Sequence, residues 1–219
     1  MSSRQIKVYK DLMGENEVWA EKIRALCAKT NTVMLNIIGS PGCGKTALLE
    51  KMAQQNKKNI TFAVLEGDVE TTHDAERLDT HNIIVSQLLS GGSCHLEAKL
   101  VYHALADLEL DKIDLVFVEN VGNLVCPAEF DIGERAKIAV LSITEGEDKP
   151  VKYPLLFSEA KAVVLSKIDL LPHLSFDIES CVSYIKQVNP DVPIFQLSAQ
   201  SGKGMEEWNE WIRKNIEGN

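Results

Sequence analysis

The chain has 219 residues, of which 45% are hydrophobic and 25% charged, and its formal net charge is −9. This composition is that of a globular protein with one sizeable core, and the acidic balance excludes broad nucleic-acid binding, which needs clustered lysine and arginine. The sequence lacks an apolar run long enough for a membrane span, and its N-terminal stretch carries charges throughout, so we expect neither a membrane segment nor a secretory one. Five cysteines without a framework spacing indicate thiols kept in a reducing cytoplasm.

Hydrophobic periodicity predicts an alternation of strands and helices along the chain. Residues 5–30 carry apolar side chains at helical spacing and form one amphipathic helix, or two that separate near Gly14. Apolar, β-branched runs predict strands at 32–38, 60–65, 83–85, 114–119, 139–143, 162–165 and 193–197. Helices are expected at 47–53, 178–188 and 205–216, and a further helix follows residue 95 and ends near residue 108. A polar link is expected at 145–154. The alternation predicts an α/β fold with a mostly parallel sheet and helices on both faces.

Residues 39–46 read Gly-Ser-Pro-Gly-Cys-Gly-Lys-Thr and fit G-x-x-x-x-G-K-[ST], the pattern of the phosphate-binding P-loop. The pattern stands between a strand and a helix, where backbone N–H groups and the helix N-terminus converge on a β-phosphate. Lys45 is expected to reach the β- and γ-oxygens, and the Thr46 hydroxyl to ligate Mg²⁺. The expected nucleotide contacts are Gly42, Cys43, Gly44, Lys45, Thr46 and Ala47. The motif predicts a three-layer P-loop NTPase fold.

Acidic residues follow two of the predicted strands, at the sheet edge where doubly wound folds bind ligands. Asp68 and Asp74 lie in a polar segment and are candidate ligands of Mg²⁺ or of its water, with solvated loop acids as the alternative. Glu119 closes an apolar strand as a Walker B acid does. With Gly122 it resembles the D-x-x-G element of GTPases, whose glycine N–H meets the γ-phosphate.

Residues 166–169, Ser-Lys-Ile-Asp, resemble N-K-x-D, the guanine-reading motif of GTPases. The Asp169 carboxylate can accept hydrogen bonds from guanine N1–H and N2–H₂. Adenine offers no such pair of donors, so a buried Asp169 left unpaired by adenine would weaken binding by about 1–3 kcal/mol. The Lys167 stem would pack along the base, and Ser198 and Ala199 stand where GTPases contact guanine O6. We therefore expect GTP rather than ATP. Ser166 replaces an asparagine amide that usually braces this loop against the P-loop, which predicts weaker nucleotide affinity.

A cysteine–histidine pair and one further cysteine form a second chemical group. Cys94, His95 and Cys126 offer thiolate and imidazole ligands, which suit Zn²⁺ or Ni²⁺. Adjacent residues grip one ion only where the backbone is irregular, and residues 91–93, Gly-Gly-Ser, supply that irregularity. Three ligands leave a tetrahedral site incomplete, so water or a second copy of the chain would complete it. His103 lies about 12 Å further along a helix and could join only a second or an intersubunit ion.

The position of Cys126 connects this group with the nucleotide. Cys126 follows Gly122 closely, so a shift of that segment driven by the γ-phosphate would move a metal ligand. Cys27 and Cys181 instead lie on the apolar stripes of predicted helices and are expected to be core residues.

These motifs together resemble the HypB family, the nickel-insertion GTPases of [NiFe]-hydrogenase maturation. The resemblance covers nearly the whole chain and rests on the P-loop and on residues 66–68, 74–77, 92–96 and 119–127. It implies a GTPase that dimerises with nucleotide, holds Ni²⁺ or Zn²⁺ at Cys94, His95 and Cys126 near the subunit interface, and passes nickel on. It also implies two partners, a small zinc-containing protein that binds nickel and the hydrogenase large-subunit precursor.

Two features depart from the family pattern. Residues 1–30 have neither the cysteine cluster nor the histidine-rich tract of some members, and Ser166 alters the base loop. A relative that handles nickel for urease carries Cys-Pro-His, whereas residues 126–128 here read Cys-Pro-Ala, which favours the hydrogenase branch. We expect an N-terminal helical segment at 1–30, packed on a GTPase domain at 31–219.

The expected reaction is the in-line attack of water on GTP, which gives GDP and phosphate. Lys45, Mg²⁺ on Thr46 and the P-loop N–H groups would neutralise the developing charge. Asp74 or Glu119 would orient the water or Mg²⁺. The sequence shows no glutamine after Gly122 and no evident arginine finger, so slow basal turnover is expected.

Two other classes of function use the same P-loop. A small-molecule kinase would leave the guanine-reading segment 166–169 without a purpose. A regulatory G protein, or a chaperone for a cobalamin enzyme or for urease-type nickel insertion, would carry Cys94 and Cys126 as structural thiols. Replacing both cysteines by serine separates these hypotheses, because a metallochaperone must lose metal binding while nucleotide binding survives.

Overall fold

The central strand of the sheet carries the P-loop at its carboxyl end. In the computed structural model, which describes residues 3–55, 60–68 and 83–217, the strand order is β3-β2-β4-β1-β5-β6-β7. All paired strands in this part of the chain are parallel. The strands are β1 Val33–Gly39, β2 Phe62–Asp68, β3 Ile84–Leu89, β4 Leu115–Glu119, β5 Ala136–Ser142, β6 Ala160–Ser166 and β7 Ile194–Gln196. The predicted α/β class with a parallel sheet is confirmed.

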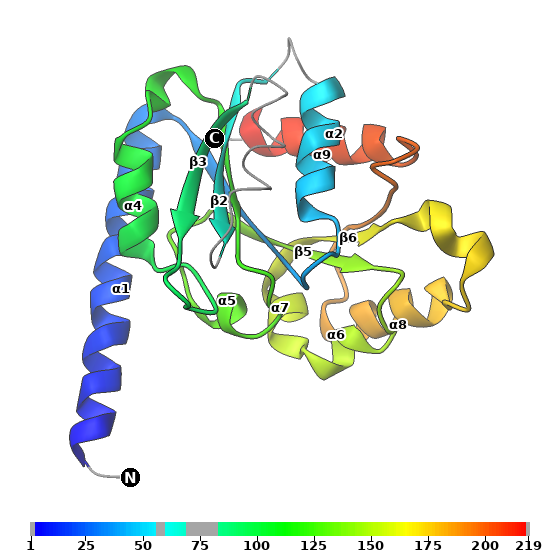
Figure 1. The fold of residues 1–219 in the computed structure, drawn as a ribbon, viewed down its shortest axis with the longest axis horizontal. Helices are drawn as coiled ribbons and strands as arrows, with labels where there is room; N and C mark the ends of the chain where they lie inside the picture. The colour runs from blue at the N-terminus through cyan, green and yellow to red at the C-terminus, as the bar shows by residue number, and fades with distance from the viewer. Residues whose placement is uncertain (1–2, 56–59, 69–82, 218–219) are drawn as a thin grey trace.

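Helices cover both faces of the sheet (Figure 1). They are α1 Ser3–Thr30, α2 Lys45–Gln55, α4 Ala98–Ala106, α5 Cys126–Glu129, α6 Lys149–Lys152, α7 Pro154–Glu159, α8 Ile178–Val188 and α9 Met205–Glu217, with the 3₁₀ helices η1 Leu110–Lys112 and η2 Ile168–His173. Alternate residues of a strand point to opposite faces. Leu35 and Ile37 of β1 therefore pack with α2 and α9, whereas Met34 packs with α1 and α4, and Ile38 packs with α7 and α8.

Of the two alternatives for residues 5–30, the single helix is confirmed, since α1 runs through Gly14 without a break. Two other expectations change. β5 begins earlier than expected, at Ala136. The expected polar link at 145–154 contains α6 and the start of α7, and each of these helices has proline in its first turn, where the missing N–H costs nothing. Within the described residues, no helix is long and apolar enough to cross a membrane.

The strand register brings the carboxyl ends of three strands together. Glu119 of β4 pairs with Glu66 of β2 on one side and with Ile37 of β1 on the other. Because all three strands run in the same direction, the loops that follow them lie at one edge of the sheet. The P-loop and the loop after Glu119 therefore face one another.

Candidate functional site

The P-loop has the close packing and backbone geometry that its glycines allow. Gly42 and Gly44 have φ values of +72° and +101°, which L side chains rarely adopt. At Gly39, an added Cβ would lie 2.5 Å from the Val140 carbonyl oxygen and 2.6 Å from the Cys43 sulfur. Burial raises the pKa of the Cys43 thiol to about 11, so this thiol stays protonated near neutral pH.

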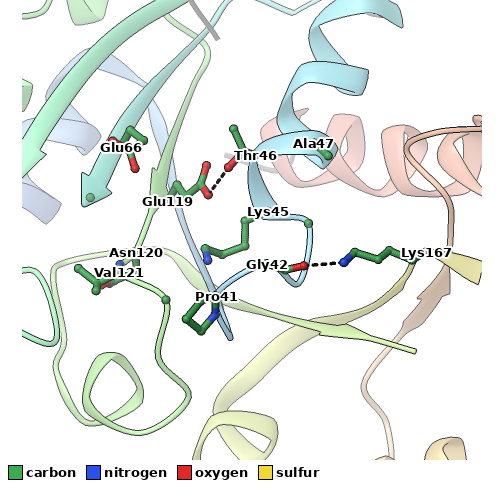
Figure 2. Close-up of a pocket in the computed structure, with 13 residues that line it drawn as sticks. Pro41, Gly42, Lys45, Thr46, Ala47, Glu66, Glu119, Asn120, Val121 and Lys167 are labelled. Carbon is green, nitrogen blue, oxygen red and sulfur yellow. Dashed lines mark hydrogen bonds between the residues drawn. The ribbon is translucent and has the colours of Figure 1, made fainter. Parts of the chain in front are cut away.

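A cleft of about 580 Å³ opens beside the P-loop (Figure 2). Its lining comprises Pro41, Gly42, Gly44, Lys45, Thr46, Ala47, Glu66, Gly67, Glu119, Asn120, Val121, Gly122 and Lys167. Lys45 is buried, and its Nζ lies 3.5 Å from the Gly39 carbonyl oxygen. Most of the residues expected at the phosphates thus line one cleft.

One end of the cleft carries a cluster of oxygen atoms. The Thr46 hydroxyl donates to Glu119 Oε1 at 2.8 Å, and both residues are buried. Glu66, also buried, lines the same cleft. A hydroxyl and two carboxylates form the all-oxygen donor set that Mg²⁺ prefers, so these residues fit that ion. Sequence reasoning missed Glu66, although its place beside Glu119 follows from the parallel pairing of β2 with β4.

The base loop is braced against the P-loop despite the replacement of asparagine. Ser166 is buried, and its hydroxyl donates to the Cys43 carbonyl oxygen at 2.5 Å. Lys167, with a φ of +62°, donates from Nζ to the Gly42 carbonyl oxygen at 2.6 Å, as Figure 2 shows. The loss of the amide therefore does not remove the brace, because the shorter serine reaches the backbone directly.

The residues expected to read the base lie at the same end of the sheet. Asp169 is exposed, so a cost for leaving it unpaired arises only when a bound base covers it. Ser198 is buried, and its Oγ accepts from the Ser201 N–H at 3.1 Å, which orders the loop that contains Ala199. The Ile168 N–H donates to the Leu197 carbonyl oxygen at 3.3 Å and joins the two segments.

Cys94, His95 and Cys126 meet in space. One ligand atom of each lies within 4.8 Å of the others, and no further group of three such residues is found in the described part of the chain. In a tetrahedral site, ligand atoms about 2.0–2.3 Å from the ion lie roughly 3.3–3.8 Å from one another, so small side-chain movements would close this cluster on Zn²⁺ or Ni²⁺. The predicted cluster is thus assembled by two loops that are distant in sequence.

Neighbouring groups orient His95 and shift the pKa values of His95 and Cys94. The His95 ring stacks on Phe130 with a centroid distance of 3.7 Å. Burial lowers the pKa of His95, which favours the neutral imidazole that binds metals. The hydrogen bond with Cys126 and, next, burial raise the pKa of the Cys94 thiol. Metal binding must therefore displace a proton from Cys94.

A buried polar chain connects the cluster with the nucleotide cleft. Asn120 Oδ1 accepts from the N–H groups of Val121, at 3.0 Å, and Leu96, at 3.3 Å. Its Nδ2 donates to Asn36 Oδ1 at 3.1 Å, and Asn36 Nδ2 donates to Glu134 Oε1 at 3.1 Å. Asn120 thus holds the residue after His95 and the residue before Gly122. Sequence reasoning missed it, because its partners are distant in the chain.

The remaining predicted site residues lie elsewhere. Asp74 lies outside the described residues, and Asp68 enters only as the last residue of β2. His103 is exposed on α4 with its ring 5.5 Å from that of Trp19, and it does not belong to the thiol cluster. Cys27 and Cys181 are buried, as expected of core residues.

The fold and the cleft define a P-loop nucleotide-binding protein. The family model described as "CobW/HypB/UreG, nucleotide-binding domain" matches residues 33–196. Hydrogenase maturation factor HypB of Azotobacter vinelandii is 47% identical over 212 residues, which cover 97% of this chain and 70% of the relative. The chain therefore belongs to the HypB family of hydrogenase maturation factors.

Solved structures of this family have the same fold. HypB of Helicobacter pylori, in complex with nickel, superimposes with a TM-score of 0.89 at 35% identity, covering 94% of this chain and 96% of the other. HypB of Archaeoglobus fulgidus gives a TM-score of 0.87 at 35% identity, covering 93% of this chain and 100% of the other.

Proposed function

We propose that this chain is a GTP-hydrolysing metallochaperone that binds nickel or zinc at Cys94, His95 and Cys126 and delivers nickel to the hydrogenase large-subunit precursor. The observation that carries the proposal is the meeting of these three ligands, within 4.8 Å, beside a P-loop cleft. The nickel complex of the H. pylori relative supports nickel as the cargo.

Hydrolysis of GTP would depend on residues that line the cleft beside the P-loop. Lys45 and the N–H groups from Gly42 to Thr46 would hold the phosphate oxygens and neutralise the charge of the transition state. Thr46 would hold Mg²⁺ with Glu119, and the ion supplies positive charge at the β- and γ-phosphates. Glu119 or Asp74 would orient the attacking water. We expect slow turnover, because Asn123 stands where many GTPases have glutamine.

Guanine selectivity would come from the base loop. Asp169 would accept from guanine N1–H and N2–H₂, Lys167 would lie along the base, and Ser198 and Ala199 would face O6. The support is the brace from Ser166 and Lys167 to the P-loop carbonyls, which places the base loop beside the phosphates.

Cargo binding would follow from the chemistry of the ligands. Cys94 and Cys126 would bind as thiolates and His95 as neutral imidazole, a donor set that suits Ni²⁺ and Zn²⁺ better than oxygen-loving cations. Water or a second copy of the chain would supply the remaining ligands. A nucleotide-dependent movement of the loop after Glu119 would then move Cys126 and change the affinity for the ion.

Further parts of the proposal concern assembly. We propose a homodimer that forms with nucleotide, a small zinc- and nickel-binding maturation partner, and a cytoplasmic location. We also propose that residues 1–30 form a helical segment packed on a GTPase domain at 31–219, and that His103 could serve a second or intersubunit ion.

The test is a calorimetric titration of the reduced full chain with Ni²⁺ and with Zn²⁺, in GDP and in a non-hydrolysable GTP analogue. Molecular mass in solution is followed in parallel. The proposal expects affinity or stoichiometry to change with the nucleotide, and expects Cys94→Ser and Cys126→Ser to lose metal binding while they keep GDP binding. Identical weak binding in both nucleotide states would leave a GTPase and remove nickel delivery. Metal binding that survives both substitutions would favour a chaperone with structural cysteines.

A further inference from the structure

Helix α1 contacts both chain segments that carry the thiol and imidazole ligands. Asn16 Oδ1 accepts from the Ala98 N–H at 2.9 Å, and Asn16 Nδ2 donates to the Asp131 carbonyl oxygen at 2.7 Å. Ala98 lies shortly after His95, and Asp131 lies shortly after Cys126. One side-chain amide thus spans the two segments whose separation decides whether the three ligands can meet. In Figure 1, α1 lies alongside α4.

On the first segment, the Asn16 side chain caps the N-terminus of α4. Ala98 is the first residue of α4, and the preceding residue, Glu97, makes no side-chain cap hydrogen bond. The first N–H groups of a helix have no acceptor within the helix. Asn16 supplies an acceptor from a different helix, so the start of α4 is fixed relative to α1.

On the second segment, α1 forms hydrogen bonds with the turn that follows α5 and packs against it. Arg24 Nη1 donates to both carboxylate oxygens of Asp131 at 3.0 Å. Gly133, with a φ of +79°, packs so closely that an added Cβ would lie 2.6 Å from the Ala20 carbonyl oxygen. The position of this turn is therefore set by α1 as well.

We propose that Asn16 is a positioning residue of the metal site, because it fixes the distance between the segment that carries Cys94 and His95 and the segment that carries Cys126. The inference rests on the proposed metal site. A side-chain amide is planar and rigid, so its two hydrogen bonds tie the segments together at a set separation. Asn16 does not line the nucleotide cleft described above, so its loss should change metal binding and leave nucleotide binding unaltered.

Three variants of the full chain separate positioning from simple stability. Asn16→Ala removes both hydrogen bonds. Asn16→Asp keeps an acceptor for the Ala98 N–H but loses the donor to Asp131, so the cap remains and the bridge is broken. Arg24→Ala is the matched control, because it weakens the hold of α1 on Asp131 alone and leaves both hydrogen bonds of Asn16 in place.

The readout is Ni²⁺ affinity, measured under reducing conditions by competition with a chromogenic chelator, together with the thiolate-to-nickel absorption band. GDP affinity and the melting temperature are measured beside it. We expect nickel to bind about tenfold more weakly to both Asn16 variants, the size usual for supporting residues of metal sites. The melting temperature should fall for both Asn16 variants, because Asn16→Asp also leaves the Asp131 carbonyl oxygen without its donor, whereas GDP affinity should stay near wild type for both. The negative charge of Asp would by itself attract the cation, so weaker binding would reflect lost geometry.

Two results would overturn the inference alone. Wild-type nickel affinity in both Asn16 variants would show that the bridge does not set the ligand separation. An equal loss in Arg24→Ala would show that any loosening of α1 has this effect. A wild-type chain that binds no Ni²⁺ would instead overturn the proposed function, and this inference with it.

Discussion

Gly122 provides a direct test of the contact between the P-loop and the loop that follows Glu119. A Cβ added at this position would lie 2.8 Å from Pro41 Cγ and 3.0 Å from the Pro41 Cα and N. Carbon atoms pack comfortably at about 3.5–4.0 Å, so Gly122→Ala requires a displacement of about 0.5–1 Å. The proline ring is rigid and the other two atoms are backbone, so we expect the loop after Glu119 to move.

We expect Gly122→Ala to slow the proposed GTP hydrolysis about 10- to 100-fold, because a displacement near 1 Å would misplace the groups that we propose act at the γ-phosphate. GDP affinity should change less than about threefold, because the P-loop N–H groups that we propose bind the β-phosphate stay in place. Phosphate release and titration with fluorescent GDP measure the two quantities. Gly14→Ala is the control, since its added Cβ meets nothing within 4 Å. Turnover within twofold of wild type, with intact folding, would refute the reasoning.

Three further predictions concern buried and partly buried groups. Ser166→Ala removes the donor to the Cys43 carbonyl oxygen and should weaken GDP binding about tenfold, as measured by fluorescence titration. An unchanged Kd would show that Lys167 alone suffices to brace the base loop. Cys181→Ser places a hydroxyl in the core and should lower the free energy of unfolding by about 1–3 kcal/mol in urea, with nickel stoichiometry unchanged; a loss of nickel would contradict its core role. Burial raises the pKa of Glu134 above its ordinary value of 4.5, so the stability that Glu134 contributes is complete below that value and is lost as pH rises through the raised pKa. The unfolding free energy of wild type minus that of Glu134→Gln should therefore fall from about pH 4 upward in urea titrations, and a rise with pH would contradict burial as the dominant influence.

The parts of the site that lie within one short stretch could be predicted from the sequence. The P-loop is a local structure, since a strand, a glycine-rich turn and a helix start suffice to specify it. The cluster of Cys94, His95 and Cys126 was also predictable, because its residue types are rare and the loops that carry them follow parallel strands.

The residues that hold these parts in place could not be predicted in the same way. Asn16 reaches Ala98 and Asp131, and Asn120 reaches Asn36 in the middle of an apolar strand. Each partner is brought close only by the packing of separate elements, and no sequence spacing encodes it. An asparagine in a helix or a strand looks like a solvated residue until its partners are known.

The two residues that brace the base loop differ in position from the residue that we propose reads the base. Ser166 and Lys167 are tied to the carbonyls of Cys43 and Gly42, whereas Asp169 is exposed beyond them. A change at Asp169 would therefore leave the anchorage of the phosphate loop intact. Base preference and phosphate binding can drift separately during evolution, so a descendant of this chain could come to favour another purine without first dismantling its P-loop.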